Sequence, residues 1–268
     1  MTELAVIMSI YNQDKLPFVR ESVESILAQT FSDFHYFLIF DGPVPTEIEQ
    51  YITGITDDRI RLYRLEQNCG LAVALNTLLE VVLKNPDYKY IARMDADDIS
   101  LNERFEKQRQ YLTNNPDINI LGTWYEEIDK TGRHLAFRKP PCEHEKLRRR
   151  FLFRTPFAHS SVMFRRNLFD VAGFYPLNTY MMEDNYLWGI ALVHGLRFSN
   201  IGSYMLKFRV DKDFYKRRFG FKYGSNYIKT KFRINRLLRV SPIYYFVSVF
   251  IGLFRMLPPS IIKSFSRI

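Results

Sequence analysis

Three aspartates stand close together in the run Arg93-Met94-Asp95-Ala96-Asp97-Asp98. Two carboxylates separated by one residue can reach one hard cation, and Mg²⁺ or Mn²⁺ prefers such oxygen ligands together with substrate phosphates. A solvated acidic turn is the alternative. However, the run follows an apolar, strand-like segment, and crowded carboxylates repel one another when no cation is bound. We therefore expect Asp95 and Asp97 to bind a divalent metal.

A second acidic pair, Glu183-Asp184, opens a helical pattern over residues 183–194 that Gly195 is expected to end. The helix dipole favours the charged form of a carboxylate at a helix N-terminus. Such a group could accept a proton as a general base, or the pair could only cap the helix. Taken alone, the pair favours the capping interpretation.

The segments that must position these acids alternate between strands and helices. Four apolar segments predict buried strands, at residues 4–10, 36–40, 60–65 and 88–94. Helical periodicity follows the first and third of them, with Asp14 and Asn68 as the expected N-caps. This alternation is typical of a mostly parallel sheet, which binds ligands beyond the carboxyl ends of its strands. Because Tyr11, Asp41 and the acidic run all follow strands, we expect them at one edge.

Beyond residue 115 the pattern is looser. Strands are expected at residues 118–124, 161–164 and 204–208. One or two basic helices are expected over residues 212–239, and an apolar, aromatic segment follows at residues 241–257. The chain shows no internal repeat and no low-complexity linker.

The ordered motifs resemble those of the family 2 glycosyltransferases, which have the GT-A fold. The matching runs are Val6–Asn12, Phe40-Asp41-Gly42, Asn68-x-Gly70 with Leu75-Asn76, Arg93–Asp98, Glu183-Asp184-x-x-Leu187-Trp188, and Gly195 to Asn200-Ile201. Each motif is weak alone, but the ordered set is specific and extends to about residue 210. The resemblance implies an α/β fold with a Rossmann-like, mostly parallel central sheet flanked by helices.

The resemblance also implies which side chains surround the donor. Those that would hold the nucleotide or lie beside the donor are Ser9, Tyr11, Asp41, Asn68, Gly70 and Asn76. Asp41 would accept a hydrogen bond from the base. Local alternatives remain, because Asp41 or Asn68 could cap a helix and Gly70 could make a tight turn.

The charged residues receive the chemical roles. Arg93 would face the diphosphate, since a guanidinium suits phosphate oxygens, with an ordinary surface ion pair as the alternative. Asp95 would contact the ribose or the metal, and Asp97 would be the principal ligand of Mn²⁺ or Mg²⁺. Asp184 would be the catalytic base of a single displacement that inverts the anomeric centre.

Two signatures of relatives are missing from this sequence. The Gln-x-x-Arg-Trp run of processive members is absent, which indicates transfer of a single sugar. Many relatives carry Tyr-Arg-x-His with a metal-binding histidine, where this chain has Phe208-Arg209-Val210-Asp211, so the role of Asp211 stays open. His159 is either a site residue or a satisfied structural histidine.

Positive charge is concentrated at the C-terminal end. The chain carries +9, but residues 201–268 hold fifteen Lys and Arg against two Asp, so this part is +13 and the first 200 residues are −4. The apolar segment Ile243–Phe254 is too short to span a bilayer. A basic stretch beside such a segment suits an anionic membrane surface, and a helix packed on the catalytic domain is the alternative.

The expected organisation follows from these features. Residues 1–210 would form the GT-A catalytic domain, with a nucleotide-sugar-binding half at 1–115 and an acceptor-binding half at 116–210, and residues 211–268 would associate with the membrane. Met1 leads directly into a strand, so no signal peptide is expected. Cys69 and Cys142 suit free thiols in a reducing compartment. We expect a cytoplasmic enzyme, peripheral at the inner face of the plasma membrane.

The predicted activity is transfer of a sugar from a nucleotide diphosphate sugar, UDP by analogy, to an acceptor hydroxyl. The acceptor would be a glycan or a lipid-linked sugar in surface-polysaccharide synthesis. A metal-dependent nucleotidyltransferase is the nearest alternative, although residues 9–13 do not form a Gly-rich phosphate loop. A non-catalytic protein that binds membrane or nucleic acid is another alternative. For the transferase no nucleic-acid partner is expected.

Overall fold

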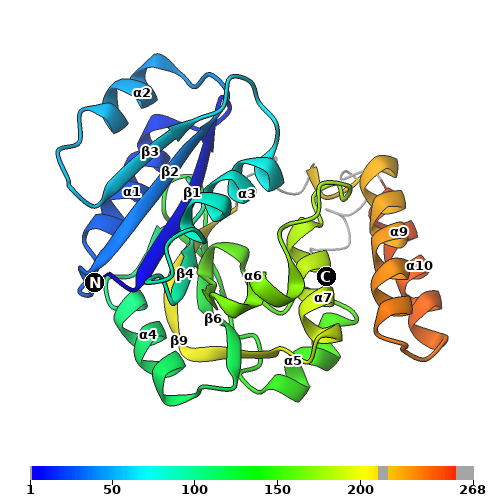
Figure 1. The fold of residues 1–268 in the computed structure, drawn as a ribbon. Helices are drawn as coiled ribbons and strands as arrows, with labels where there is room; N and C mark the ends of the chain where they lie inside the picture. Colours follow the sequence, from blue (N-terminus) through cyan, green and yellow to red (C-terminus); the bar gives the residue numbers. More distant parts are fainter. Residues whose placement is uncertain (1, 211–216, 258–268) are drawn as a thin grey trace.

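The computed structural model describes residues 2–210 and 217–257. Its centre is one sheet with helices packed on both faces, as Figure 1 shows. The strands lie in the order β3-β2-β1-β4-β8-β6-β9-β5, and β7 pairs with β6 beside this path. This α/β architecture, whose longest strand pairs are parallel, confirms the expected fold class.

Four parallel strands form the first half of the sheet. They are β1 (Leu4–Tyr11), β2 (Phe34–Asp41), β3 (Ile60–Arg64) and β4 (Tyr90–Arg93). β1 lies between β2 and β4, with Tyr11 beside Asp41 and Ile7 beside Arg93. The carboxyl ends of these strands therefore meet at one edge, and all four strands were predicted.

Four helices accompany this half. They are α1 (Leu16–Leu27), α2 (Thr46–Thr53), α3 (Leu71–Val82) and α4 (Arg104–Asn114). The helices predicted at α1 and α3 are confirmed, but their predicted caps are wrong. The Asp14 carboxylate accepts the Tyr11 N–H at 2.8 Å and so holds the end of β1 rather than the start of α1. α3 begins after Gly70, not Asn68, and the Gly70 φ of 89° is readily adopted by glycine alone.

β1 is buried on both faces, which explains its nearly continuous apolar sequence. Met8 faces one core together with Val23 of α1, and Ile7 faces the other together with α3. Ser9 and Tyr11 continue the row of Ile7, because side chains two positions apart share a face of a strand. They are half-buried where the core ends.

The second half of the sheet is built around a long parallel pair, β6 (Ile118–Ile128) and β9 (Arg197–Arg209). The shorter strands β5 (Ile99–Ser100), β7 (His134–Arg138) and β8 (Met163–Arg165) join it by antiparallel pairing. The helices here are α5 (His144–Phe151), η1 (His159–Ser161), α6 (Asn167–Ala172) and α7 (Glu183–Val193). The predicted helix at α7 is confirmed, and β9 starts earlier than its predicted residue 204. No prediction was made for α2, α4, α5, α6, β5 or β7.

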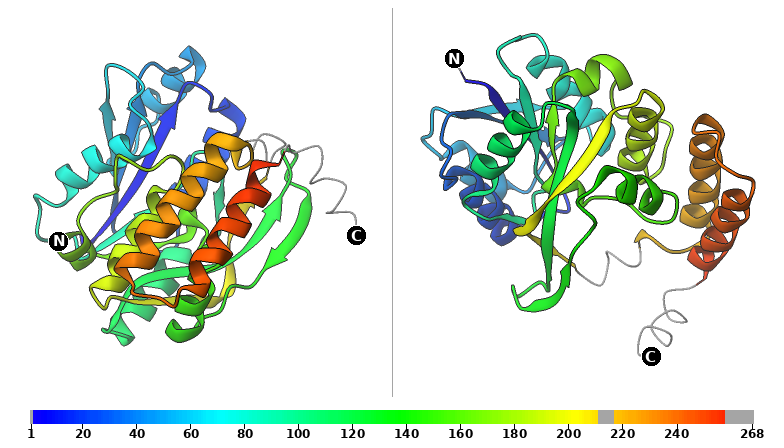
Figure 2. Two further views of the ribbon diagram at one scale, coloured as in Figure 1. Left: turned by 90° about the vertical axis from the view of Figure 1, so that its right-hand side faces the viewer. Right: turned by 90° about the horizontal axis from the view of Figure 1, so that it is seen from below.

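Two further helices, α9 (Phe221–Leu237) and α10 (Ile243–Met256), form a hairpin outside the part of the chain that contains the sheet (Figure 2). α9 packs against α7, and α10 packs against α9. Buried Lys231 connects α9 to the end of α5, because its Nζ donates to the Phe151 carbonyl at 2.6 Å. Burial lowers the pKa of Lys231 to about 7. The predicted basic helices thus lie partly in α9, while residues 212–216 lie outside the described residues.

Two glycines allow the close approach of α9 and α10. A Cβ added to Gly224 would lie 2.6 Å from the Gly252 carbonyl oxygen and 2.5 Å from Met256 Cγ. Gly224→Ala is therefore expected to lower the free energy of unfolding by about 1–3 kcal/mol, measured in urea with circular dichroism. The control is Gly202→Ala, whose Cβ would meet its nearest atom at 3.6 Å. Equal losses in the two variants would contradict this packing.

Candidate active site

The side chains expected around the donor lie at the carboxyl edge of β1, β2 and β4. Ser9 and Tyr11 are half-buried at the end of β1, and Tyr11 is in register with buried Asp41 of β2. β4, which pairs with β1 on the other side, leads directly into the acidic run that starts at Asp95. The sheet therefore brings together polar residues from three separate segments, as expected.

Asp41 is bound to the loop before α3. Its two carboxylate oxygens accept the N–H groups of Cys69 and Gly70 at 2.7 and 2.9 Å, and the Asn68 amide donates to its carbonyl at 3.3 Å. Gly42 permits this approach, because a Cβ there would lie 2.4 Å from the Asn68 nitrogen. Asp41 thus fastens the loop, and each of its oxygens can still accept a second hydrogen bond.

The acidic run forms a tight cluster. One carboxylate oxygen each from Asp95, Asp97 and Asp98 lies within 4.8 Å of the others. Burial raises the pKa of Asp97 to about 6, and the charge of Asp95 adds to this effect. Burial also raises the pKa of Asp98 well above its usual range, with Asp97 contributing. Such crowding disfavours the charged forms unless a cation compensates, and carboxylate oxygens are suitable ligands for Mg²⁺ or Mn²⁺.

Asp98 differs from the other two acids because the protein itself occupies its carboxylate. The Ser160 hydroxyl and the Arg209 N–H both donate to it, the latter at 2.7 Å, and Asp98 is 1% exposed. Arg209 Nε also donates to the Asp97 carbonyl at 2.8 Å and so fixes the loop. Asp95 and Asp97 are therefore the more available carboxylates, and their assignment as the metal pair stays a prediction.

Arg93 is a buried cation beside this cluster. It is 1% exposed, and its Nη2 pairs with Asp95. Its Nε and Nη1 have no hydrogen-bond partner within the described residues. Buried N–H groups without an acceptor are costly, so a bound group that accepts from them would stabilise the site. The alternative of an ordinary surface ion pair is wrong for Arg93.

Asp184 lies in the first turn of α7, near the same guanidinium group. Its carboxylate accepts the Asn185 N–H at 2.7 Å. Burial raises the pKa of Asp184, while the hydrogen bonds from Asn185 and the charges of Arg218 and Arg93 act in the opposite direction. Asp95 and Asp184 both lie within electrostatic range of Arg93. The expected base and the acidic cluster are thus in the same part of the molecule.

Two arginines that sequence reasoning missed complete the charged surroundings. Arg218 lies within electrostatic range of Asp184 and Asp95, and Arg217 Nη1 is 3.5 Å from the Tyr11 hydroxyl. Their only sequence signal is a basic pair shortly after the last core strand. From the sequence, this pair was considered only as part of the positive charge of residues 201–268. Asp211, whose role stayed open, lies outside the described residues.

Asn76 and His159 belong to a neutral network next to Arg93. The Asn76 amide donates to the Tyr175 carbonyl at 2.8 Å and accepts the Tyr175 N–H at 2.9 Å. The Tyr175 hydroxyl lies 2.8 Å from His159 Nε2. Burial and the charge of Arg93 hold the pKa of His159 well below its usual range. Asn76 therefore positions a loop, and His159 fits the interpretation as a satisfied structural histidine.

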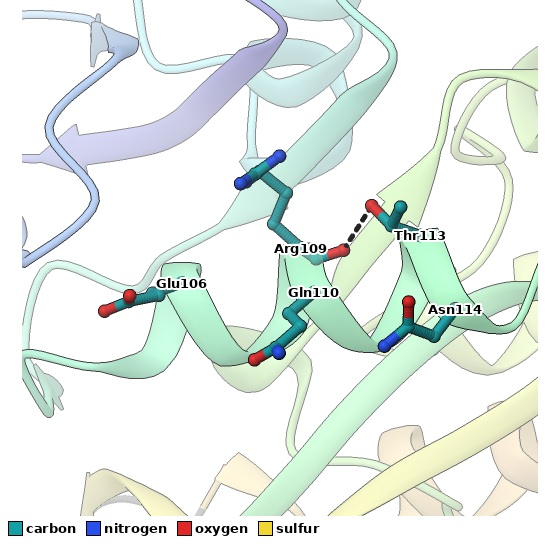
Figure 3. Close-up of a pocket in the computed structure, with 5 residues that line it drawn as sticks. All are labelled: Glu106, Arg109, Gln110, Thr113 and Asn114. Atoms are coloured by element: carbon teal, nitrogen blue, oxygen red, sulfur yellow. Dashed lines mark hydrogen bonds between the residues drawn. The ribbon is translucent and has the colours of Figure 1, made fainter.

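A shallow hollow on the surface of α4 lies elsewhere (Figure 3). Its lining residues all come from that helix and are Glu106, Arg109, Gln110, Thr113 and Asn114. Arg109 pairs at 2.9 Å with Glu3, which precedes β1 and so lies at the amino ends of the parallel strands. The hollow is thus at the opposite end of β1 from the acidic cluster.

Solved structures resemble this chain along most of its length. A mannosyltransferase from Pyrobaculum calidifontis in complex with GDP-Man and Mn²⁺ has a TM-score of 0.66 and 13% identity, over 95% of this chain and 72% of that chain. Residues 1–349 of S. aureus TarS in complex with UDP-GlcNAc have a TM-score of 0.62 and 15% identity, over 88% and 70%. These similarities confirm the expected GT-A fold.

Sequence comparison identifies closer relatives. The amylovoran biosynthesis glycosyltransferase AmsE of Erwinia amylovora is 32% identical over 87% of this chain and 84% of its own length. The UDP-Gal:α-D-GlcNAc-diphosphoundecaprenol β-1,3-galactosyltransferase of Escherichia coli is 31% identical over 96% and 93%. The family model described as "Glycosyl transferase family 2" matches residues 5–173, which include β1 except its first residue, the acidic cluster and α6. The chain therefore belongs to family 2 of the glycosyltransferases.

Proposed function

We propose that this glycosyltransferase inverts the anomeric centre and moves one sugar from a nucleotide diphosphate sugar, using Mn²⁺ or Mg²⁺. The observation that carries the proposal is the shared position of the Asp95–Asp97 pair and Asp184 around Arg93. Asp95 and Asp97 can bind a cation that also binds the diphosphate, while Asp184 accepts the proton of the acceptor hydroxyl. Family membership favours this activity over the nucleotidyltransferase and the non-catalytic alternatives.

The residues present fit a divalent metal. Asp95 and Asp97 offer hard oxygen ligands, and Asp98 is buried beside them, with each of its carboxylate oxygens accepting a hydrogen bond from the protein. A metal held by Asp95 and Asp97 would neutralise the negative charge that develops on the diphosphate leaving group. The bound cation would then offset the electrostatic repulsion between these carboxylates.

The remaining steps fall to the side chains around the sheet edge. Ser9, Tyr11 and Asp41 would hold the base and ribose, with Asn68 and Gly70 shaping that end of the site. The free Nε and Nη1 of Arg93 would donate to diphosphate oxygens. Asp184 would remove the acceptor proton as the hydroxyl oxygen attacks the anomeric carbon, whose bond to the diphosphate oxygen breaks. No covalent sugar–enzyme intermediate forms.

The donor is proposed to be a UDP-sugar and the acceptor a glycan or lipid-linked sugar in surface-polysaccharide synthesis. Support comes from the two relatives, one named for amylovoran biosynthesis and the other for transfer from UDP-Gal to a diphosphoundecaprenol-linked sugar. Residues 211–268 are proposed to associate with an anionic membrane surface at the inner face of the plasma membrane. A lipid-linked acceptor would be located there.

The direct test is release of free nucleotide from a panel of UDP-, GDP- and dTDP-sugars, with Mn²⁺, Mg²⁺ or a chelator present. We expect one UDP-sugar to be turned over with metal and none with chelator. NMR of the product should show an inverted anomeric configuration. Turnover that persists with chelator would contradict the proposed metal dependence. Retention of the anomeric configuration would contradict the proposed single displacement.

Arg218 is expected to lower the pKa of Asp184, the proposed base. Its positive charge favours the carboxylate form of Asp184, so Arg218→Gln should raise the Asp184 pKa. Because a general base works only when deprotonated, the acidic limb of the kcat/KM profile should move by about one unit to higher pH. The matched control is Arg239→Gln, an exposed arginine after α9. An identical acidic limb in both variants would contradict this role.

A further inference from the structure

α10 carries an exposed apolar face. Its sequence IYYFVSVFIGLFRM contains a single charged residue, Arg255. Four of its large apolar side chains are more than half exposed, namely Ile243 (59%), Phe246 (72%), Phe250 (74%) and Leu253 (54%). Spacings of three and four residues place them on one side of the helix. Exposed apolar surface of this extent on one element indicates an interaction site.

The opposite side of α10 is already used. Ser248 and Gly252 are buried, and a Cβ on Gly252 would lie 2.2 Å from Cγ1 of Ile228 in α9. The Ser248 hydroxyl also bonds to Asn235 of α9 at 3.1 Å. The hairpin therefore fixes which way α10 faces. Figure 1 and the right-hand view of Figure 2 show the hairpin at one side of the molecule, as an outer layer away from the sheet.

Exposed cations lie on the helix that packs against α10. α9 and the turn after it present Lys222, Lys229, Arg233, Arg236 and Arg239 to solvent. Residues 217–257 contain no Asp or Glu. An anionic lipid surface would attract these charges, each contributing a severalfold gain in affinity, while the apolar face enters the headgroup region. A second copy of the chain would instead bring like charges together.

We propose that the face formed by Ile243, Phe246, Phe250 and Leu253 lies in the interface of an anionic membrane, with α10 parallel to the surface. This names the surface behind the proposed membrane association. A 14-residue helix is about 21 Å long, so α10 suits an in-plane position. None of the described helices is long and apolar enough to cross a bilayer.

The docked orientation would place the active site next to the membrane. α9 begins directly after Arg218 and Gly220, and Arg218 lies within electrostatic range of Asp184. The start of the hairpin is therefore beside the expected base. An acceptor sugar on a lipid carrier could then reach Asp184 while its lipid stays in the bilayer.

The test is co-sedimentation of the full chain with vesicles of phosphatidylcholine, with or without phosphatidylglycerol. Wild type should bind the vesicles that contain phosphatidylglycerol. Phe246→Glu with Phe250→Glu should weaken this binding by roughly tenfold per residue or more, since two buried rings are lost. Leu135→Glu with Leu177→Glu is the matched control, because these apolar side chains are exposed elsewhere, at 51% and 68%.

The charges need a separate comparison. Arg233→Gln with Arg236→Gln should weaken binding to phosphatidylglycerol vesicles about fivefold per residue. Lys84→Gln with Lys130→Gln, which removes the same charge from exposed positions elsewhere, should not. Circular dichroism establishes that each variant is folded. Vesicle binding that survives the Phe246 and Phe250 changes would overturn the proposal, as would a lipid-free dimer that those changes dissociate. The assay requires no sugar transfer, so its failure would leave the proposed reaction intact.

Discussion

Asp184→Asn is expected to lower kcat by about 10²- to 10⁴-fold, because it removes the proposed general base for the acceptor proton. Asparagine has nearly the same shape, and its side-chain oxygen can still accept the Asn185 N–H that Asp184 holds at 2.7 Å. Binding of the nucleotide should therefore be retained. The measurement is steady-state transfer together with calorimetric titration of UDP in the presence of Mn²⁺.

Glu183→Gln is the control that distinguishes the two neighbouring acids. Burial raises the pKa of Glu183 to about 7, with Asp184 contributing, so Glu183 is partly protonated near neutral pH. Its loss should cost much less than the loss of Asp184. If Glu183→Gln were inactive and Asp184→Asn retained its rate, the roles of the two acids would be exchanged.

Asp97→Asn is expected to reduce transfer by about 10²-fold or more, because the proposed ligand of the metal at the diphosphate is lost. The same change should make the metal-free protein more stable. The raised pKa of Asp97 means that its ionised form destabilises the fold at pH values above its ordinary pKa, and asparagine removes that charge. Activity and thermal midpoint should therefore move in opposite directions.

Asp117→Asn is the matched control for this prediction. The Asp117 side chain is 58% exposed and pairs with Arg197 at the surface, away from the acidic cluster. Asp117→Asn should change neither the rate of sugar transfer nor the way in which the thermal midpoint depends on metal. A destabilised Asp97→Asn would indicate that the carboxylate supports the fold rather than a ligand.

The sheet edge and its acids could be predicted because their signals are local. A buried strand reads as an apolar run, and Asp95 and Asp97 lie directly after one such run. The parallel order of β1, β2 and β4 then follows from the alternation with helices. The helix that starts at Glu183 and carries Asp184 in its first turn was predicted from its own periodicity and from Gly195.

Other features depend on contacts that sequence order does not show. Asp98 is fixed by Ser160 and by Arg209, residues 62 and 111 positions away. Arg218 reaches Asp184 because α9 returns to α7. The two capping errors have different causes. Asp14 accepts a local hydrogen bond from the Tyr11 N–H, three residues before it, instead of capping α1. Asn68 donates to the Asp41 carbonyl, 27 residues before it, so a tertiary hydrogen bond replaces the expected cap of α3.

The central claim is that Asp97 and its neighbour bind a cation and a diphosphate in the same site where Asp184 acts. Calorimetric titration of UDP tests it most directly, with wild type, Asp97→Asn and Asp184→Asn each measured with Mn²⁺ and with chelator. We expect Mn²⁺-dependent binding in wild type and Asp184→Asn, and weak, Mn²⁺-independent binding in Asp97→Asn. UDP binding of equal strength in all three proteins, unchanged by chelator, would contradict the account.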